Sequence, residues 1–182
     1  MRRNLTVLTR IGRAFALWPV LLLGGYWPAA ATPRHDLAAL IECRQSVADF
    51  AQIFPYSQSP LKSVSLGWRP LPVKNPFMTE FTLLHPITIF GHPTQQIAFS
   101  GGSIMAILDV ADPHPLAKQL QLNPAIDTAD KVLFGRELVS RDTTNPSTGK
   151  AAIESIVLNV STVHSHPGKT LVGCNYSLDD PD

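Results

Sequence analysis

Residues 153–178, near the C-terminus, alternate hydrophobic and polar residues in two runs that are joined by a short turn at residues 166–169. A period of two is typical of a β-strand with one face in the core and the other in water. The residues on the hydrophobic face are Ile156, Leu158 and Val160 in the first run and Val172, Cys174, Tyr176 and Leu178 in the second. We therefore expect a hairpin whose second strand points Cys174 into the core.

Residues 35–54 repeat hydrophobic residues at helical spacing, which predicts one amphipathic helix. Asp36 is placed to cap its first turn, and Pro55 is expected to end it. On a helical wheel Cys43 falls within the apolar arc, close to Val47. The pattern therefore predicts that this cysteine also faces the core.

Residues 56–76 are rich in serine, proline and lysine, and their prolines disfavour a long helix or strand. We expect an extended, proline-rich segment that lies over the surface. The aromatic residues in and beside it are Tyr56, Trp68 and Phe77. They would either form a rigid interaction surface or belong to the core, with Trp68 anchoring the segment.

Three further runs predict strands in the middle of the chain. Residues 77–91 alternate but contain Pro86, which indicates an edge position or a bend. Residues 95–100 and 103–109 flank Gly101-Gly102, a pair typical of a tight hairpin turn. These runs predict a second hairpin before the C-terminal one.

A short helix is expected after Asp112-Pro113, and residues 131–141 predict another strand, with Gly135 as a bulge or close-packing point. Short turns between most of the strands favour antiparallel pairing. The sequence thus predicts an α+β fold. Its N-terminal helix packs on a largely antiparallel sheet of about six or seven strands, with one short inserted helix.

Residues 1–31 have the organisation of a secretory signal peptide, with four arginines before an uncharged apolar run. Ala29-Ala30-Ala31 supplies the small residues that favour cleavage before Thr32. The alternative is an inner-membrane anchor through residues 14–31, which are uncharged and near the lower length limit for a span. With cleavage, residues 32–182 would form one domain in the periplasm or outside the cell.

Removing the predicted signal peptide changes the charge of the protein. Eleven lysine and arginine residues then remain against fourteen acidic ones, a net charge of minus three. No basic run is present, so we expect no nucleic-acid partner and no membrane contact beyond the signal segment. The expected partner is another envelope or secreted protein.

The two cysteines, Cys43 and Cys174, are both predicted to face the core of an exported protein. This arrangement favours a structural disulfide over a thiol nucleophile. The bond would join the N-terminal helix to the last strand.

Candidate chemistry is sparse, because the sequence has no nucleophile elbow, phosphate-binding loop or other catalytic motif. His164 and His166 lie two positions apart and could share a face that binds copper or zinc. Two ligands fall short of the three or four that zinc sites use, and turn residues flank this pair, which predicts solvent-exposed histidines. We expect neither a metal site nor a cofactor.

These observations favour a noncatalytic binding or interaction protein, such as an inhibitor or an envelope-assembly factor. An envelope hydrolase remains the alternative, because active sites assemble from residues that are distant in sequence. A histidine-based metal-binding protein is the less favoured alternative.

We predict that the exported protein begins at Thr32, because the basic head, the apolar run and the alanine triplet together specify cleavage. Intact mass spectrometry of the exported protein measures its N-terminus directly. A protein that retains residues 1–31 and stays in the membrane through an alkaline wash would support the anchored alternative.

Overall fold

The structure is a computed structural model that describes residues 36–181. The helices are α1 (Leu37–Ile41), α2 (Val47–Ser57), α3 (Pro60–Ser65) and α4 (His114–Gln119). The strands are β1 (Trp68–Pro70), β2 (Thr79–Ile89), β3 (His92–Ser100), β4 (Ser103–Leu108), β5 (Asn123–Asp127), β6 (Val132–Thr144), β7 (Ala151–Ser161) and β8 (Thr170–Asp179). No helix in this part of the chain is long and apolar enough to cross a membrane. The predicted signal peptide, residues 1–31, and the alternative anchor lie outside the described residues.

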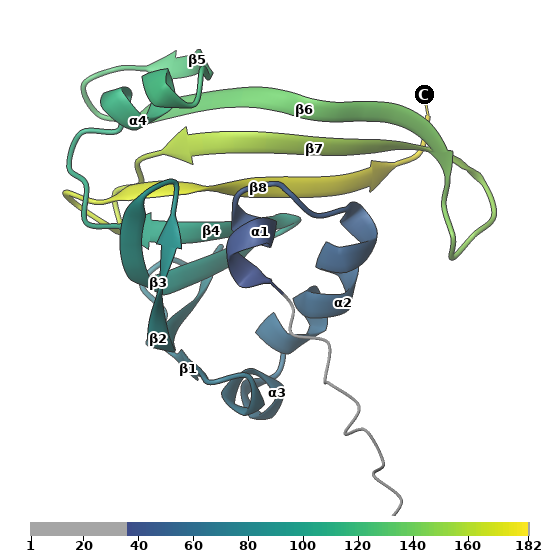
Figure 1. Cartoon of the computed structure of the whole chain (residues 1–182), viewed down its shortest axis with the longest axis horizontal. Helices are drawn as coiled ribbons and strands as arrows, with labels where there is room; N and C mark the ends of the chain where they lie inside the picture. Colours follow the sequence, from purple (N-terminus) through teal and green to yellow (C-terminus); the bar gives the residue numbers. More distant parts are fainter. Residues whose placement is uncertain (1–35, 182) are drawn as a thin grey trace, which may run out of the picture. The chain divides into compact units, whose positions relative to one another are not determined.

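The eight strands form one antiparallel sheet in the order β1-β2-β3-β4-β8-β7-β6-β5. Strands β1 to β4 make one meander and β5 to β8 make another, and the two meet where β4 pairs with β8 (Figure 1). Residues 103–108 of β4 lie opposite residues 170–175 of β8. The predicted antiparallel sheet is confirmed, with eight strands instead of six or seven.

The two faces of the sheet are packed differently. Helices α1 and α2 lie against one face, where their buried side chains and those of the strands form the main core (Figure 1). Cys174 and Tyr176 of β8 enter this core, as predicted. On the opposite face, which we call the outer face, a smaller buried cluster consists of Met78, Ala98, Met105, Ile107 and Leu171.

The predicted N-terminal helix is divided into α1 and α2. Helix α1 ends at Ile41 and is followed by a turn in which Cys43 is left-handed, with φ +58°. The Cys43 N–H donates to the Leu40 carbonyl oxygen and the Arg44 N–H donates to that of Ala39, as in a Schellman motif. Ser46 then starts α2 with a capping box. One continuous helix is therefore wrong, because this turn redirects the chain at Cys43.

The proline-rich part of the chain also differs from expectation. Pro55 does not end the helix, because α2 continues to Ser57. The following segment, residues 56–76, is not extended throughout, since it contains α3 and β1. Pro60 lies in the first turn of α3, where the missing N–H of a proline has no helical partner to lose. The predicted extended segment is confirmed only in part, for the strand β1 and the loop of residues 71–76 that follows it.

Irregular pairing marks the places where strands bend. The register of β2 against β3 shifts near Pro86, as predicted. In β6 the shift lies between Glu137 and Val139, so the predicted bulge at Gly135 is wrong. Strand β5, which starts at Asn123, was not predicted; it pairs with β6 at the edge of the sheet.

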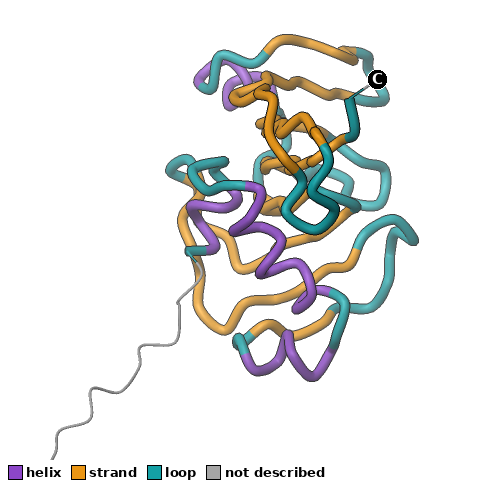
Figure 2. The backbone as a smooth tube through the Cα atoms, turned by 90° about the vertical axis from the view of Figure 1, so that its right-hand side faces the viewer, coloured by secondary structure: helices purple, strands orange, loops and turns teal. Residues whose placement is uncertain are grey.

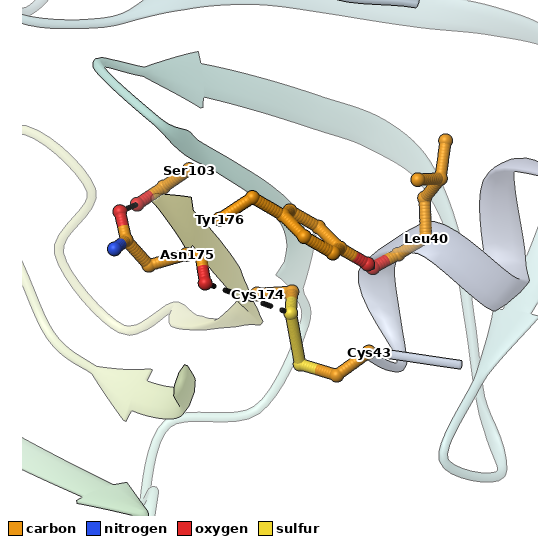
Figure 3. The surroundings of a disulfide bond; sticks show 6 residues. All are labelled: Leu40, Cys43, Ser103, Cys174, Asn175 and Tyr176. Atoms are coloured by element: carbon orange, nitrogen blue, oxygen red, sulfur yellow. Dashed lines mark hydrogen bonds between the residues drawn. A yellow bond between two sulfur atoms is a disulfide. The ribbon is translucent and has the colours of Figure 1, made fainter. Parts of the chain in front are cut away.

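A disulfide and a hydrogen bond attach α1 to β8 (Figure 3). Cys43 and Cys174 form the disulfide that the sequence predicts, with Cα atoms 5.3 Å apart. The Tyr176 hydroxyl donates to the Leu40 carbonyl oxygen at 2.8 Å. Burial, together with the nearby Asp49 carboxylate, raises the pKa of Tyr176, so this hydroxyl keeps its proton. A crosslink of this span stabilises the folded protein by about 4 to 5 kcal/mol, because it lowers the conformational entropy of the unfolded chain.

Two glycines of the sheet differ in what a side chain would meet. At Gly173 of β8 a Cβ atom would lie 2.1 Å from the Ile104 carbonyl oxygen and 2.6 Å from the Met105 Cα atom. At Gly135 of β6 the nearest atom, the Leu158 carbonyl oxygen, is 3.7 Å away. Gly173 is therefore required for the close approach of β4 to β8, whereas the space at Gly135 accepts a side chain.

We predict that Gly173→Ala lowers the free energy of unfolding by about 2 kcal/mol or more, because β4 and β8 must separate to admit the methyl group. Gly135→Ala should leave the free energy of unfolding unchanged or raise it by up to about 1 kcal/mol, because alanine loses less chain entropy than glycine. Urea unfolding of both variants measures the difference. A similar loss in both variants would contradict the distinction between the two glycines.

Candidate functional site

The exposed hydrophobic side chains gather at one end of the sheet. Among residues 36–181, seven large hydrophobic residues are exposed, and six of them lie between positions 61 and 84. These six are Leu61 (87% exposed), Val64 (56%), Leu66 (38%), Val73 (77%), Phe77 (80%) and Leu84 (56%). We call this region, formed by α3, β1, residues 71–78 and Leu84, the edge surface. Exposed hydrophobic residues that gather on one part of a surface commonly mark interaction sites.

The edge surface follows β1, the last strand at this edge of the sheet. The Leu84 N–H donates to the Gly67 carbonyl oxygen at 3.0 Å, which places Leu84 beside the residues that follow α3. Residues 71–78 begin at the other end of β1. The three residues of β1, about 10 Å of strand, therefore lie between one hydrophobic group, on α3 and Leu84, and the other, Val73 and Phe77. Figure 1 and Figure 2 both show α3 and β1 at the end of the fold away from α4 and β5.

Positive charge accompanies these hydrophobic residues. From position 50 to 108 the chain has three cationic residues and a single acidic one, Glu80, which is buried. The three cations, Lys62, Arg69 and Lys74, are exposed and belong to the edge surface. From position 109 to 182 the chain has ten acidic and six basic residues. Because the two meanders form opposite halves of the sheet, the two halves also differ in charge.

The structure separates the three aromatic residues that the sequence predicts as an interaction surface. Phe77 is 80% exposed and belongs to the edge surface. Trp68 is only 5% exposed, and its ring lies 5.7 Å from those of Phe81 and Phe99. Tyr56 is partly buried against the main core. Of the two alternatives considered for Trp68, the structure shows the core anchor, because this side chain attaches β1 to the main core.

Part of the outer face is open. A groove of about 450 Å³ lies over β4, β8, β7 and β6, and the short β5 borders it. Its lining includes Ser103, Leu133, Gly135, Val157, Asn159 and Asn175, and none of its lining residues is charged. Another part of the outer face holds the buried cluster around Met105, against which Val163 from the β7–β8 loop packs.

A chain of polar residues links the β7–β8 loop, residues 162–169, to β2. His166 Nδ1 lies 3.0 Å from Ser165 Oγ, and His166 Nε2 lies 3.1 Å from Glu80 Oε2. His166 and Glu80 are 6% and 4% exposed. The second carboxylate oxygen, Glu80 Oε1, has no hydrogen-bond partner within the described residues. The connectivity matches a nucleophile, base and acid, and it also fastens the loop over the outer face.

The two histidines predicted as a weak metal pair do not converge. His164 is exposed, whereas His166 is buried and bonded to Glu80. The expectation that both are solvent-exposed turn residues is therefore wrong for His166. Across residues 36–181, no group of three or more histidine, cysteine or acidic residues is arranged to hold a metal ion.

His114 forms a separate cluster at the other end of the sheet. Its Nδ1 lies 2.6 Å from Asp112 Oδ1, and its Nε2 lies 3.0 Å from Asp127 Oδ1. The hydrogen bond to Asp112, and then the one to Asp127, raises the pKa of His114 above its ordinary value. The ring also packs edge-on against Phe134. This cluster joins α4 to β5, and because both ring nitrogens are engaged we assign it a structural role.

Sequence reasoning identified Phe77 but missed the other residues of the edge surface. The sequence does contain one signal for the edge surface, because positions 50–108 have three cationic residues and a single acidic one. The burial of Glu80 with His166 could not be read from spacing, because 86 positions separate the two residues. Comparison of the chain with protein-family models, with curated proteins and with solved structures found no match.

Proposed function

We propose that this protein is an exported, noncatalytic interaction protein that binds another envelope or secreted protein through the edge surface. The observation that carries the proposal is the gathering of six exposed large hydrophobic residues beside three exposed cations. Protein interfaces combine a hydrophobic centre with a polar, charged rim. An inhibitor or an envelope-assembly factor would use such a surface.

Phe77 is the best-placed contact on the edge surface. Its N–H donates to Asn75 Oδ1 at 3.0 Å, and the Met78 N–H donates to the Asn75 carbonyl oxygen at 3.1 Å. Met78 itself is buried on the outer face, so the turn is held on both sides of Phe77. A turn whose backbone is already held in place loses little conformational freedom on binding. The partner should therefore offer a hydrophobic recess for Phe77.

The positive charge of the edge surface indicates which groups should surround the hydrophobic recess of the partner. Lys62, Arg69 and Lys74 are exposed without an exposed acidic residue in the same stretch of chain. Acidic groups around the hydrophobic recess would complement them and accelerate association at low ionic strength. Binding through this surface should therefore weaken as the salt concentration rises.

Export is part of the same proposal. The Cys43–Cys174 disulfide supports it, because such bonds persist in oxidising compartments such as the periplasm and the cell exterior. The basic and apolar organisation of residues 1–31 supports it independently.

A second candidate function is hydrolysis of an envelope polymer or ester. The chain formed by Ser165, His166 and Glu80 favours it, because the histidine is bonded to a hydroxyl on one side and a carboxylate on the other. Two observations favour a structural role instead. His166 is nearly inaccessible, and the lining of the outer-face groove does not include Ser165. We therefore place hydrolysis second.

We predict that a photo-crosslinking residue in place of Phe77 forms an adduct with one protein of discrete mass in cells. The same residue in place of Leu138, which is 39% exposed on the other half of the sheet, is the matched control and should form none. Changing both Val73 and Phe77 to serine should weaken binding of the purified partner about tenfold or more, because hydrophobic anchors dominate interfaces. The variant Leu138→Ser should bind as the wild type does.

Adduct masses decide between the outcomes. Equal adducts at positions 77 and 138, or none at either, would contradict an interaction through the edge surface. Lipid adducts at position 77 would replace the protein partner with a membrane surface.

We predict that a fluorophosphonate probe, which labels activated serines, does not modify the purified protein, because His166 is held in a buried structural contact. Mass spectrometry of the probe-treated protein measures this. A stoichiometric adduct on Ser165 that disappears in His166→Gln would promote hydrolysis to the first candidate.

A further inference from the structure

The groove of the outer face has an open space beside Gly135 and Asn159, which we call the trough. Gly135 of β6 lies opposite Asn159 of β7, and Asn159 lies opposite Gly173 of β8. Gly135 has no side chain, so open space lies beside the Asn159 amide on the β6 side, whereas on the β8 side the backbone of β4 fills the space at Gly173. The groove around it has a volume of about 450 Å³, within the usual range of ligand sites.

The fold accounts for Gly173 but not for Gly135. Gly173 permits the close approach of β4, as its contacts with Ile104 and Met105 show. Gly135 has no positive φ, and a Cβ atom there would make ordinary contacts of 3.7 and 3.9 Å. A glycine inside a strand weakens that strand, and close approach of a ligand is one reason for it. The sheet therefore does not require a glycine at position 135, and the missing side chain leaves open space in the groove.

Two side-chain amides, those of Asn159 and Asn175, line this space. The Asn159 side chain makes no hydrogen bond within the described part of the chain and lines the groove. Asn175 Oδ1 accepts a hydrogen bond from Ser103 Oγ at 2.9 Å. This bond orients the amide so that its NH₂ group points away from Ser103 (Figure 3). Asn159 thus offers a donor and an acceptor, and Asn175 offers a donor.

We propose that this groove binds a short, uncharged peptide segment in an extended conformation. A side-chain amide can pair with the N–H and C=O of a peptide main chain at the same time. The absence of charge in the lining excludes complementary contacts for a charged ligand, because burying an unpaired charge is costly. Leu133 and Val157 suit a small aliphatic side chain of the segment. No aromatic ring lines the groove for a sugar to stack on.

This site lies on the outer face, and the proposal does not depend on the function proposed for the edge surface. The test titrates ¹⁵N-labelled wild-type protein with a blocked hexapeptide of alternating valine and alanine residues. We expect saturable shifts of the side-chain NH₂ signals of Asn159 and Asn175. A hexapeptide with glutamate in place of valine should bind at least tenfold more weakly.

Two variants of the same strand and face provide the matched comparison. Gly135→Val should reduce the peptide affinity at least tenfold, because its side chain fills the trough. Ser140→Val, an exposed position of β6 outside the groove, should bind as the wild type does. Asn159→Leu should weaken binding while the thermal unfolding midpoint stays within a few degrees of the wild type.

Several results would overturn the proposal. One is the absence of saturable shifts up to about 10 mM peptide, roughly ten times a dissociation constant of 1 mM, which corresponds to a binding free energy of about −4 kcal/mol. Another is equal binding by wild type and Gly135→Val. Saturable shifts of the same two amides with maltotriose, but not with the peptide, would instead assign the groove to a carbohydrate.

Discussion

The pairing of β4 with β8 is the constraint on which the rest of the structure depends. It is the one pairing in the sheet that joins the two meanders, and it connects residues about seventy positions apart in the chain. Gly173 makes this pairing possible, since a Cβ atom there would lie 2.1 Å from the Ile104 carbonyl oxygen. The neighbouring residue, Cys174, fixes β8 to α1 through the disulfide. Gly173 therefore allows the second meander to pair with the first, and its neighbour Cys174 links the N-terminal helices to the second meander.

The sheet order places two stretches of the chain that differ in charge in different halves of the sheet. Positions 50–108 have three cations and one buried acid, whereas positions 109–182 have an excess of acidic residues. In the sheet order these two stretches supply separate halves, so the two halves of the sheet differ in net charge. Hydrophobic exposure follows the same division, because Leu138 alone of the seven exposed large hydrophobic residues of the described chain lies in the second half. Such a polarised surface favours one orientation of approach by a partner.

The parts of the fold that the sequence predicts are those with a local signal. Alternation in residues 153–178 specifies both which residues of β8 enter the core and the facing of Cys174. The division of the N-terminal helix was not predictable from periodicity, because Cys43 adopts a left-handed conformation that glycine usually provides. For the candidate site, the sequence predicted Tyr56, Trp68 and Phe77 as either surface contacts or core residues, and the structure exposes only Phe77. The burial of His166 depends on Glu80 in a distant strand, and turn residues nearby wrongly indicated exposure.

Strand β8 contributes residues both to the main core and to the outer face of the sheet. Cys174 and Tyr176 point into the main core, while Gly173 and Asn175 point to the outer face beside the groove. A slip of one residue in the register of β8 would exchange these two sets. The disulfide and the Tyr176–Leu40 hydrogen bond oppose such a slip, because both partners lie on α1 and its C-terminal turn. The covalent bond on the core face therefore also fixes the position of Asn175 on the outer face, where this residue lines the groove.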